Sequence, residues 1–187
     1  MTDAVDAADA RALVAALAER GLTLATSESL TGGLVAAAVT SVPGASTVYL
    51  GGAVAYATAM KAVLGGVDPM TLARHGAVSS QTALALAVGI RERAGSDWAV
   101  ATTGVAGPDP QEGHPPGEVW IAVAGPDGSS AVRRSFTGDR GAIRAQTVAD
   151  ALALVFAAVA RSRPGVEEIQ DGRGTVPPEP SSSRAGR

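Results

Sequence analysis

The stretch that decides the fold is TLATSESLTGGLVAAAVT, residues 23–40. Its first residues, 22–25, have the apolar pattern of a short buried strand, and residues 34–39 continue as an apolar helix. The turn between them, residues 27–33, is rich in hydroxyl side chains and glycine. Such a turn gathers hydroxyls and backbone N–H groups at the positive end of a helix, where anions and oxyanions are stabilised. An ordinary capped helix start explains the same residues, because Ser and Thr are common N-caps.

The composition indicates one domain with a core of small aliphatic side chains. The chain has 187 residues, of which 46% are hydrophobic and 3% aromatic. Such small residues suit helices packed closely on a sheet. The net charge is -3 and there is no long basic run, so nucleic-acid binding is not expected.

Cysteine is absent from the sequence, which excludes disulfides, cysteine-ligated metals and a thiol nucleophile. This absence fits a reducing cytosol. The acidic N-terminus, MTDAVDAADA, lacks the apolar core of a signal peptide. The apolar run at 151–160 is too short to span a bilayer. We therefore expect a cytoplasmic protein without a membrane partner.

Apolar periodicity and turn residues predict alternating helices and strands. The predicted elements are a helix at 6–20 stopped by Gly21, the strand–turn–helix above, a strand at 49–56, helices at 57–64 and from Asp68 to His75, a helix from Ser79 or Ser80 to 94, a strand at 97–102, a hairpin of 118–124 and 131–136, and a helix at 139–162 capped by Thr137. This order predicts an α/β fold: a three-layer α/β/α sandwich on a mixed, mostly parallel sheet of about five strands.

The composition changes after Arg163, to Pro, Gly, Ser and charged residues without apolar periodicity. Such a segment cannot bury enough apolar surface to order itself. We expect one domain at 1–163 followed by a disordered tail at 164–187.

Lys61 is the only lysine among the 15 basic residues; all others are arginine. Arginine cannot act as a base because its pKa lies above about 12, whereas burial can bring the pKa of lysine toward neutrality. A single lysine in an arginine-rich chain therefore indicates a position that needs a removable proton. A solvated helix residue in an arginine-biased composition explains it equally simply.

Three further patterns accompany the first: GGAVAYATAMKAVLG, TTGVAGPD…PPGEVWIAVAG and FTGDRGAIRAQTV. Together with SESLTGG they resemble the CinA C-terminal domain family, the bacterial nicotinamide mononucleotide deamidases. The resemblance runs from about Asp6 to Arg161. It implies a metal-free hydrolysis of the carboxamide of nicotinamide mononucleotide to nicotinate mononucleotide and ammonia, a step of NAD salvage. This chain has Leu30 where the family often has cysteine.

Amide hydrolysis needs a nucleophile, a base and oxyanion donors. His75 is expected to cap a helix and His114 to lie on the surface, and the Gly-x-Ser-x-Gly and Ser-x-x-Lys patterns are absent. A serine–lysine pair from two loops remains. Ser27 and Ser29 compete as the nucleophile, and the family match favours Ser29. The expected catalytic residues are Ser29, Lys61 and Tyr56, with Tyr56 orienting or polarising.

The remaining expected site residues bind or position the substrate. Backbone N–H groups near Thr31, Gly32 and Gly33 would hold the oxyanion, and Glu28 would position Lys61. The glycine loop with Thr103, Gly104 and Gly107 would approach the ribose phosphate. Arg140 and Arg144, one turn apart, would bind that phosphate. A tight turn and a solvated helix face explain these glycines and arginines without a ligand.

Two other functions remain open: a non-catalytic nucleotide-binding or competence regulatory module, and a hydrolase of another phosphorylated amide. No metal or cofactor is expected. The partner is a small mononucleotide. An apolar patch around Tyr49 and Leu50 would allow a homodimer.

Overall fold

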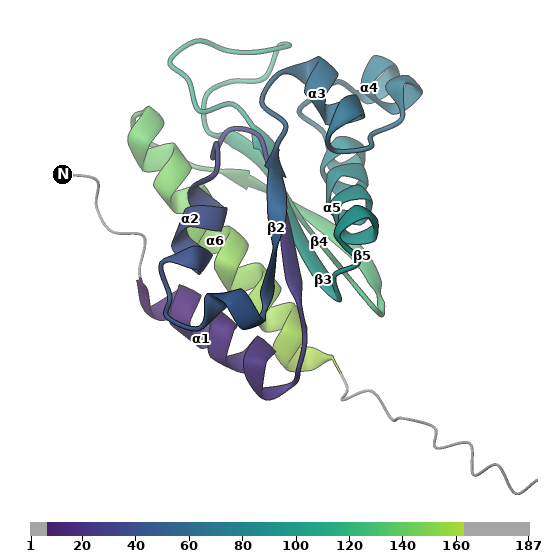
Figure 1. The fold of residues 1–187 in the computed structure, drawn as a ribbon. Helices are drawn as coiled ribbons and strands as arrows, with labels where there is room; N and C mark the ends of the chain where they lie inside the picture. The colour runs from purple at the N-terminus through teal and green to yellow at the C-terminus, as the bar shows by residue number, and fades with distance from the viewer. Residues whose placement is uncertain (1–6, 163–187) are drawn as a thin grey trace, which may run out of the picture.

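The computed structural model describes residues 7–162, so the predicted tail lies outside the described residues. Its elements alternate in the predicted order (Figure 1). They are α1 (Ala7–Glu19), β1 (Leu24–Glu28), α2 (Leu34–Thr40), the 3₁₀ helix η1 (Ala45–Thr47), β2 (Tyr49–Val54), α3 (Thr58–Val63), α4 (Pro69–His75), α5 (Ser80–Ala94), β3 (Trp98–Gly104), β4 (Glu118–Gly125), β5 (Gly128–Ser135) and α6 (Arg140–Arg161).

The sheet has five strands in the order β2-β1-β3-β4-β5. β1 pairs in parallel with both β2 and β3, whereas β4 is antiparallel to β3 and to β5. The chain reverses between β3 and β4 and again between β4 and β5, so four strands run in one direction and β4 runs opposite to them. The predicted α/β sandwich on a mixed sheet is confirmed.

Helices cover both faces of the sheet, as Figure 1 shows: α1, α2 and α6 lie on one side and α5 on the other. Every residue of the inner strands β1 and β3 is buried, and in β4 every residue except Trp120 is buried. α6 is long and apolar enough to meet the criteria for a membrane span. One stripe of α6 is buried in this domain, at Ile143, Thr147, Val148, Ala151, Leu152, Val155 and Val159.

The caps of α4 and α5 follow the sequence, whereas that of α6 does not. Ser79 caps α5 by accepting from the Thr82 N–H, and Asp68 caps α4 ahead of Pro69. The expected cap of α6, Thr137, was wrong. Asp139 is the N-cap, and its carboxylate accepts from the Ala142 N–H at 2.8 Å. Asp is the stronger cap, and its negative charge also suits the helix N-terminus.

The parallel strands deliver their carboxyl ends to one edge of the sheet. The chain leaves β1 for β2 on one side, and β3 then enters on the other side of β1. Ligands of open α/β sheets bind at such a reversal of strand order. Ser29 follows β1, Tyr56 follows β2, and Val105 follows β3, so all three loops meet there.

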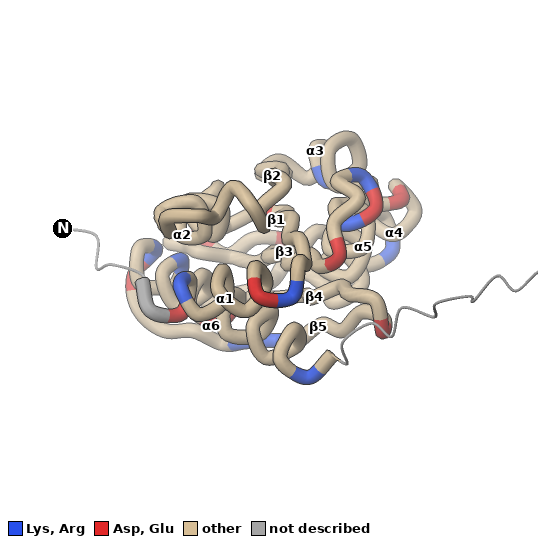
Figure 2. The backbone as a smooth tube through the Cα atoms, turned by 60° about the horizontal axis from the view of Figure 1, so that its bottom comes forward, with Lys and Arg blue, Asp and Glu red and all other residues tan. Residues whose placement is uncertain are grey.

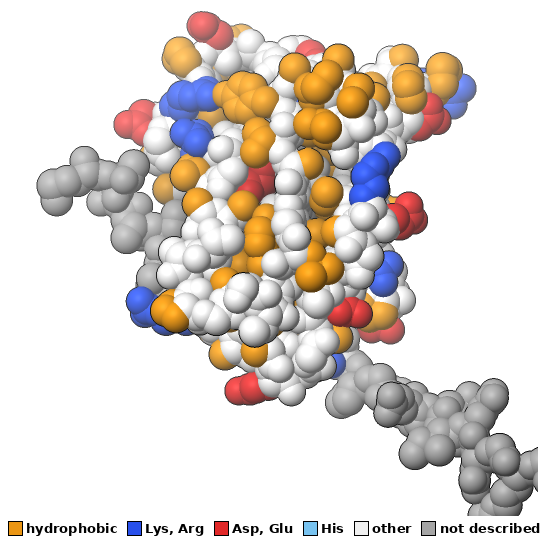
Figure 3. Space-filling view, viewed as in Figure 1, with side chains coloured by type: hydrophobic (Ala, Val, Ile, Leu, Met, Phe, Trp, Pro, Cys, Tyr) orange, Lys and Arg blue, Asp and Glu red, His pale blue; other side chains and the backbone are white. Residues whose placement is uncertain are grey.

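The surface is unevenly charged. Between Arg20 and Asp68 the sequence has only two charged residues, Glu28 and Lys61, and both are buried. The tube in Figure 2 is accordingly tan along α2 and β2. The face with β2 in front carries hydrophobic side chains over β2 and α3 (Figure 3).

Candidate active site

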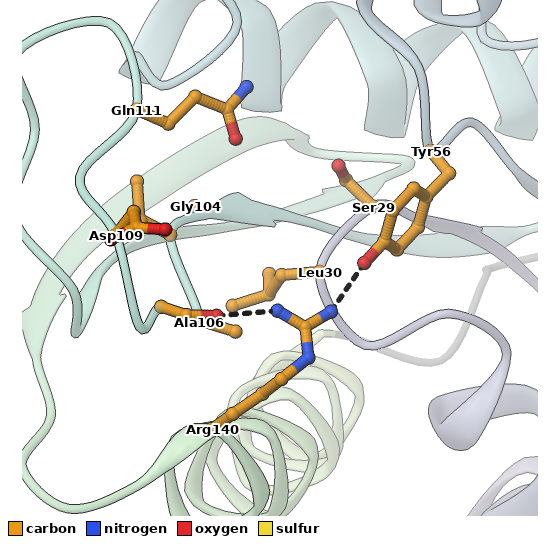
Figure 4. Close-up of a pocket in the computed structure, with 10 residues that line it drawn as sticks. Ser29, Leu30, Tyr56, Gly104, Ala106, Asp109, Gln111 and Arg140 are labelled. Carbon is orange, nitrogen blue, oxygen red and sulfur yellow. Dashed lines mark hydrogen bonds between the residues drawn. The ribbon is translucent and has the colours of Figure 1, made fainter.

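A small pocket lies at the carboxyl ends of β1, β2 and β3, where the strand order predicts it (Figure 4). Its walls come from the turn after β1, the segment after β2, the loop after β3 and the first turn of α6. The lining residues are Ser29, Leu30, Tyr56, Gly104, Val105, Ala106, Gly107, Asp109, Gln111 and Arg140.

Ser29 and Lys61 meet at this pocket although 32 positions separate them in the chain. Lys61 Nζ lies 2.9 Å from Ser29 Oγ. Lys61 is 2% exposed and Ser29 is 7% exposed. A hydroxyl and an amine at this distance, shielded from bulk water, can exchange a proton directly.

Two backbone carbonyls fix the orientation of the Lys61 amine. Nζ donates to Ala55 O at 3.0 Å and to Tyr56 O at 3.4 Å. With its two hydrogens on these carbonyls, a neutral amine turns its lone pair toward Ser29 Oγ. An ammonium can donate its third hydrogen to the same oxygen, so both protonation states have their partners.

The environment of Lys61 favours the neutral amine. Burial lowers the pKa of Lys61 below its ordinary value, and the carboxylate of Glu112 opposes this in part. A lowered pKa makes the deprotonated amine more available near neutral pH.

The turn that carries Ser29 is held from three sides. The Ser29 N–H donates to Thr102 O at 3.0 Å. The Thr31 hydroxyl is 2.8 Å from that of Thr102, and Thr31 is fully buried. Arg144 donates to Leu30 O at 3.0 Å and to Thr31 O at 2.8 Å. Thr31 and Arg144 therefore support the turn that carries Ser29 and do not line the pocket, unlike the expectation that they contact substrate.

Gly32 and Gly33 also differ from the expectation. Their φ angles are 61° and 96°, which favour glycine and let the chain enter α2. The Gly32 N–H donates to Ser29 O and the Gly33 N–H to Glu28 Oε2. Because both donors are used within the protein, these two amides do not offer the expected oxyanion hole.

Glu28 makes no hydrogen bond or ion pair with Lys61, whose amine contacts Ser29, Ala55 and Tyr56. Its carboxylate accepts the N–H groups of Gly33, Val35 and Ala36 at 2.9, 3.0 and 2.8 Å. It is 1% exposed. Glu28 thus caps α2 from the preceding strand. From the sequence we expected Glu28 to position Lys61 and did not predict this cap.

We expect Glu28→Ala to lower the free energy of unfolding by about 2–4 kcal/mol, because it leaves buried N–H groups at a helix start without their charged acceptor. Urea denaturation measures this loss. Glu28→Gln keeps one carbonyl acceptor and should lose less. A loss below about 0.5 kcal/mol in Glu28→Ala, the range of neutral surface changes, would contradict this capping role.

Arg140 joins Tyr56 to the loop after β3 at the pocket (Figure 4). The Arg140 guanidinium donates to Gly107 O at 2.8 Å and also to the Tyr56 hydroxyl. Both residues are exposed, Tyr56 by 55%. The structure therefore places a fixed positive charge at the open side of the pocket, beside the glycine loop.

Of the three residues expected in the glycine loop after β3, two line the pocket and one does not. Gly104 and Gly107 line the pocket. Thr103 does not: it is 1% exposed, and its hydroxyl donates to Ala77 O at 2.7 Å. Thr103 therefore ties β3 to the turn before α5.

Sequence reasoning missed Asp109 and Gln111, which line the pocket wall opposite Ser29 and Tyr56 (Figure 4). Two contacts hold their loop just after Gln111. Glu112 accepts from the Ala77 N–H at 2.8 Å, and His114 pairs with Glu118 at 3.1 Å. The available signal was the polar run that follows the glycine loop, residues 109–112.

Within residues 7–162, no group of three or more His, Asp or Glu side chains is placed to hold a metal ion. The side chains that the described part of the chain offers at this site are the buried Ser29–Lys61 pair and, in the pocket lining, Arg140, Asp109 and Gln111.

Comparison with known proteins identifies the domain. The family model of the CinA C-terminal domain matches residues 6–159. The chain belongs to the CinA C-terminal domain family. A CinA-like protein of Frankia casuarinae is 52% identical over 139 residues, 74% of this chain and 32% of that protein. One from Acidobacterium capsulatum is 46% identical over 137 residues, 73% of this chain and 33% of that protein.

Solved structures of CinA proteins share the fold. A CinA superfamily protein from Klebsiella pneumoniae has a TM-score of 0.80 and 36% identity, covering 82% of this chain and 97% of that one. A competence/damage inducible protein from Agrobacterium tumefaciens has a TM-score of 0.81 and 35% identity, covering 86% and 99%. The chain thus spans about a third of the CinA-like relatives and nearly all of these solved CinA chains.

Proposed function

We propose that this CinA domain is a nicotinamide-nucleotide amidase, which hydrolyses the carboxamide of nicotinamide mononucleotide to nicotinate mononucleotide and ammonia. The observation that carries the proposal is the buried Ser29–Lys61 pair, 2.9 Å apart, in a pocket with Arg140 on its far side. A nucleophile with its own base and a separate cation suit an anionic amide.

In the proposed first half-reaction, Ser29 Oγ attacks the carboxamide carbon and its proton passes to Lys61 Nζ. The tetrahedral intermediate collapses, and the C–N bond breaks as Lys61 returns the proton to the departing nitrogen. Ammonia leaves, and a nicotinoyl ester remains on Ser29. In the second half, water attacks this ester with Lys61 as base, which releases the carboxylate and restores the hydroxyl.

The oxyanion needs donors other than Gly32 and Gly33. Leu30 and Ala106 line the pocket, and their backbone N–H groups donate to no acceptor in the described part of the chain. We assign them to the oxyanion, since one follows the nucleophile and the other follows the end of β3.

The polar groups of the pocket suit the rest of this substrate. Arg140 supplies a planar cation for the phosphate. The carboxylate of Asp109 suits ribose hydroxyls, which are hydrogen-bond donors. The amide of Gln111 faces the pocket from the wall opposite Ser29 and can pair with the carboxamide (Figure 4).

The deciding experiment measures ammonia release by the purified protein in EDTA, with nicotinamide mononucleotide, nicotinamide riboside and free nicotinamide as substrates. We expect turnover of the mononucleotide, weaker turnover of the riboside and full activity in the chelator. Activity that needs one added divalent ion would overturn the serine–lysine scheme. Mononucleotide binding without ammonia release would instead support a non-catalytic nucleotide-binding module. Faster turnover of another phosphorylated amide would assign that amide as the substrate in place of nicotinamide mononucleotide.

Arg140→Ala should weaken binding of the mononucleotide by about 1.5–3 kcal/mol, the typical loss for a hydrogen bond to a charged group. It should change the KM for the riboside far less, because the riboside has no phosphate. Arg74→Ala, at an exposed arginine in the last turn of α4, is the matched control. It should leave the KM for both substrates unchanged. An equal loss with both substrates would remove Arg140 from the phosphate site.

A further inference from the structure

Residues 111–114 form a tight turn in the loop after β3, which we name the 111–114 turn. Gln111 and His114 exchange two backbone hydrogen bonds: the Gln111 N–H donates to His114 O at 3.1 Å, and the His114 N–H donates to Gln111 O at 2.9 Å. The two residues between them, Glu112 and Gly113, have φ angles of 51° and 82°. Positive φ at both central positions is characteristic of a type I′ turn, which favours Asn, Asp or Gly at the first of them.

Glu112 is an unfavourable residue for this turn. In the described range, 7–162, it is the only residue other than glycine with a positive φ. A residue with a Cβ is costly in this conformation, and Asn or Asp tolerates it better than Glu. Local turn chemistry therefore does not explain Glu112, and the reason lies in what its side chain contacts.

The carboxylate of Glu112 reaches a well-fixed part of the chain, the turn before α5. Glu112 Oε2 accepts the Ala77 N–H at 2.8 Å, and Ala77 is buried. Two hydroxyls hold this turn from behind, because Ala77 O accepts from Thr103 Oγ1 and Gly76 O accepts from Thr82 Oγ1, each at 2.7 Å. A Cβ at position 76 would lie 2.8 Å from Glu112 Oε2, so the glycine there also makes room for the carboxylate.

We propose that Glu112 is a positioning residue of the amidase: its contact with Ala77 fixes the 111–114 turn and thereby holds the Gln111 amide in the pocket wall opposite Ser29. This inference rests on the proposed function, in which Gln111 pairs with the carboxamide. Gln111 is exposed, lines the pocket and directly precedes Glu112 in the chain (Figure 4). A group that positions substrate loses much of its effect when it is displaced by about 1 Å, so its loop has to be fixed.

The test compares Glu112→Gln with Glu112→Asn, two neutral variants whose side chains differ by one methylene. Gln keeps the length of Glu, and its amide oxygen can accept the Ala77 N–H. Asn suits the type I′ turn better but is shorter and should lose the contact. Both variants lose the charge that raises the pKa of Lys61, so this effect is common to the two and cancels in the comparison.

At the plateau of the pH profile, Glu112→Gln should keep most of the wild-type kcat for nicotinamide mononucleotide. Glu112→Asn should lose at least about 10-fold, the size expected for the lost hydrogen bond of a charged group. The loss should lie in kcat more than in KM, because the phosphate contact of Arg140 is unchanged. Glu92→Asn, at an exposed glutamate of α5, is the matched control and should keep the wild-type kcat.

A double-mutant cycle tests whether Glu112 acts through Gln111. Gln111→Ala should lower kcat by itself, and Glu112→Asn should then cost little more, because both changes remove the same amide from the pocket. Hydrogen exchange reads the contact directly: the Ala77 N–H should be protected in the wild type and in Glu112→Gln, and should exchange faster in Glu112→Asn. Circular dichroism melts verify that all variants fold.

The outcomes separate this inference from the amidase itself. Equal kcat in folded Glu112→Gln and Glu112→Asn, or a loss that Gln111→Ala does not diminish, would overturn the positioning role and leave the amidase standing. Unchanged exchange of the Ala77 N–H in Glu112→Asn would overturn the contact whether or not the protein is an amidase. A wild type that releases ammonia from no amide would overturn the proposed function and this role with it.

Discussion

Lys61→Arg should lower turnover of nicotinamide mononucleotide by at least about 10²-fold, the usual scale of general-base catalysis. Arginine keeps the positive charge, but its pKa above about 12 leaves no neutral form to accept the Ser29 proton. If Lys61 only gripped phosphate or held a salt bridge, the arginine variant would keep much of its activity. Steady-state ammonia release separates these two outcomes.

Because Lys61 is 2% exposed, the larger guanidinium could disturb the fold, and a second variant is needed. Lys61→Ala removes the amine and leaves space beside Ser29. A small primary amine added to the solution should restore part of its turnover, since it can occupy this space and act as the base. A folded Lys61→Ala protein that keeps wild-type turnover would refute the role of the amine.

The pH profile should report the same amine. Lys61 acts as base only when neutral, so kcat/KM should rise with pH through the pKa of Lys61 and level off above it. Burial lowers that pKa, which places the rise below the ordinary range of lysine. Glu112→Gln removes the carboxylate that raises this pKa, and the rise should move to lower pH. A profile that Glu112→Gln leaves in place would contradict this assignment.

Ser29→Ala should lower turnover by at least about 10³-fold, because it removes the atom that forms the acyl bond. Substrate binding should survive, since Arg140 and the glycine loop are unchanged. Ser27→Ala is the matched control. Ser27 lies two positions before Ser29, is fully buried and does not line the pocket. We expect Ser27→Ala to keep turnover.

Rapid-quench mass spectrometry adds a direct test of the covalent step. A nicotinoyl ester should appear on the wild-type peptide that contains Ser29, and it should be absent from Ser29→Ala. Wild-type turnover in Ser29→Ala would refute the nucleophile and leave the family and the fold standing.

The sequence by itself determined the fold class and the element order, and it named two residues, Ser29 and Lys61, that the structure brings together. Alternation of apolar strands and helices is a local pattern, and it specified the α/β sandwich. The single lysine stands out in the sequence, whereas Ser29 could be chosen over Ser27 only through the resemblance to the family. The sequence had no means to show that they lie 2.9 Å apart, since this distance depends on how the chain after β2 turns to bring the Lys61 side chain to the turn after β1.

Only the tertiary structure decided which neighbours of these residues face the pocket. Glu28, Thr31 and Arg144 stand close to the site in sequence or along a helix face, yet their polar atoms bind the backbone and side chains around the turn that carries Ser29. Asp109 and Gln111 are exposed, as polar loop residues usually are, but the fold of their loop also places them in the pocket lining. The physical reason is that a pattern specifies the kind of element, whereas the direction of a polar side chain depends on donors and acceptors brought together from distant parts of the chain.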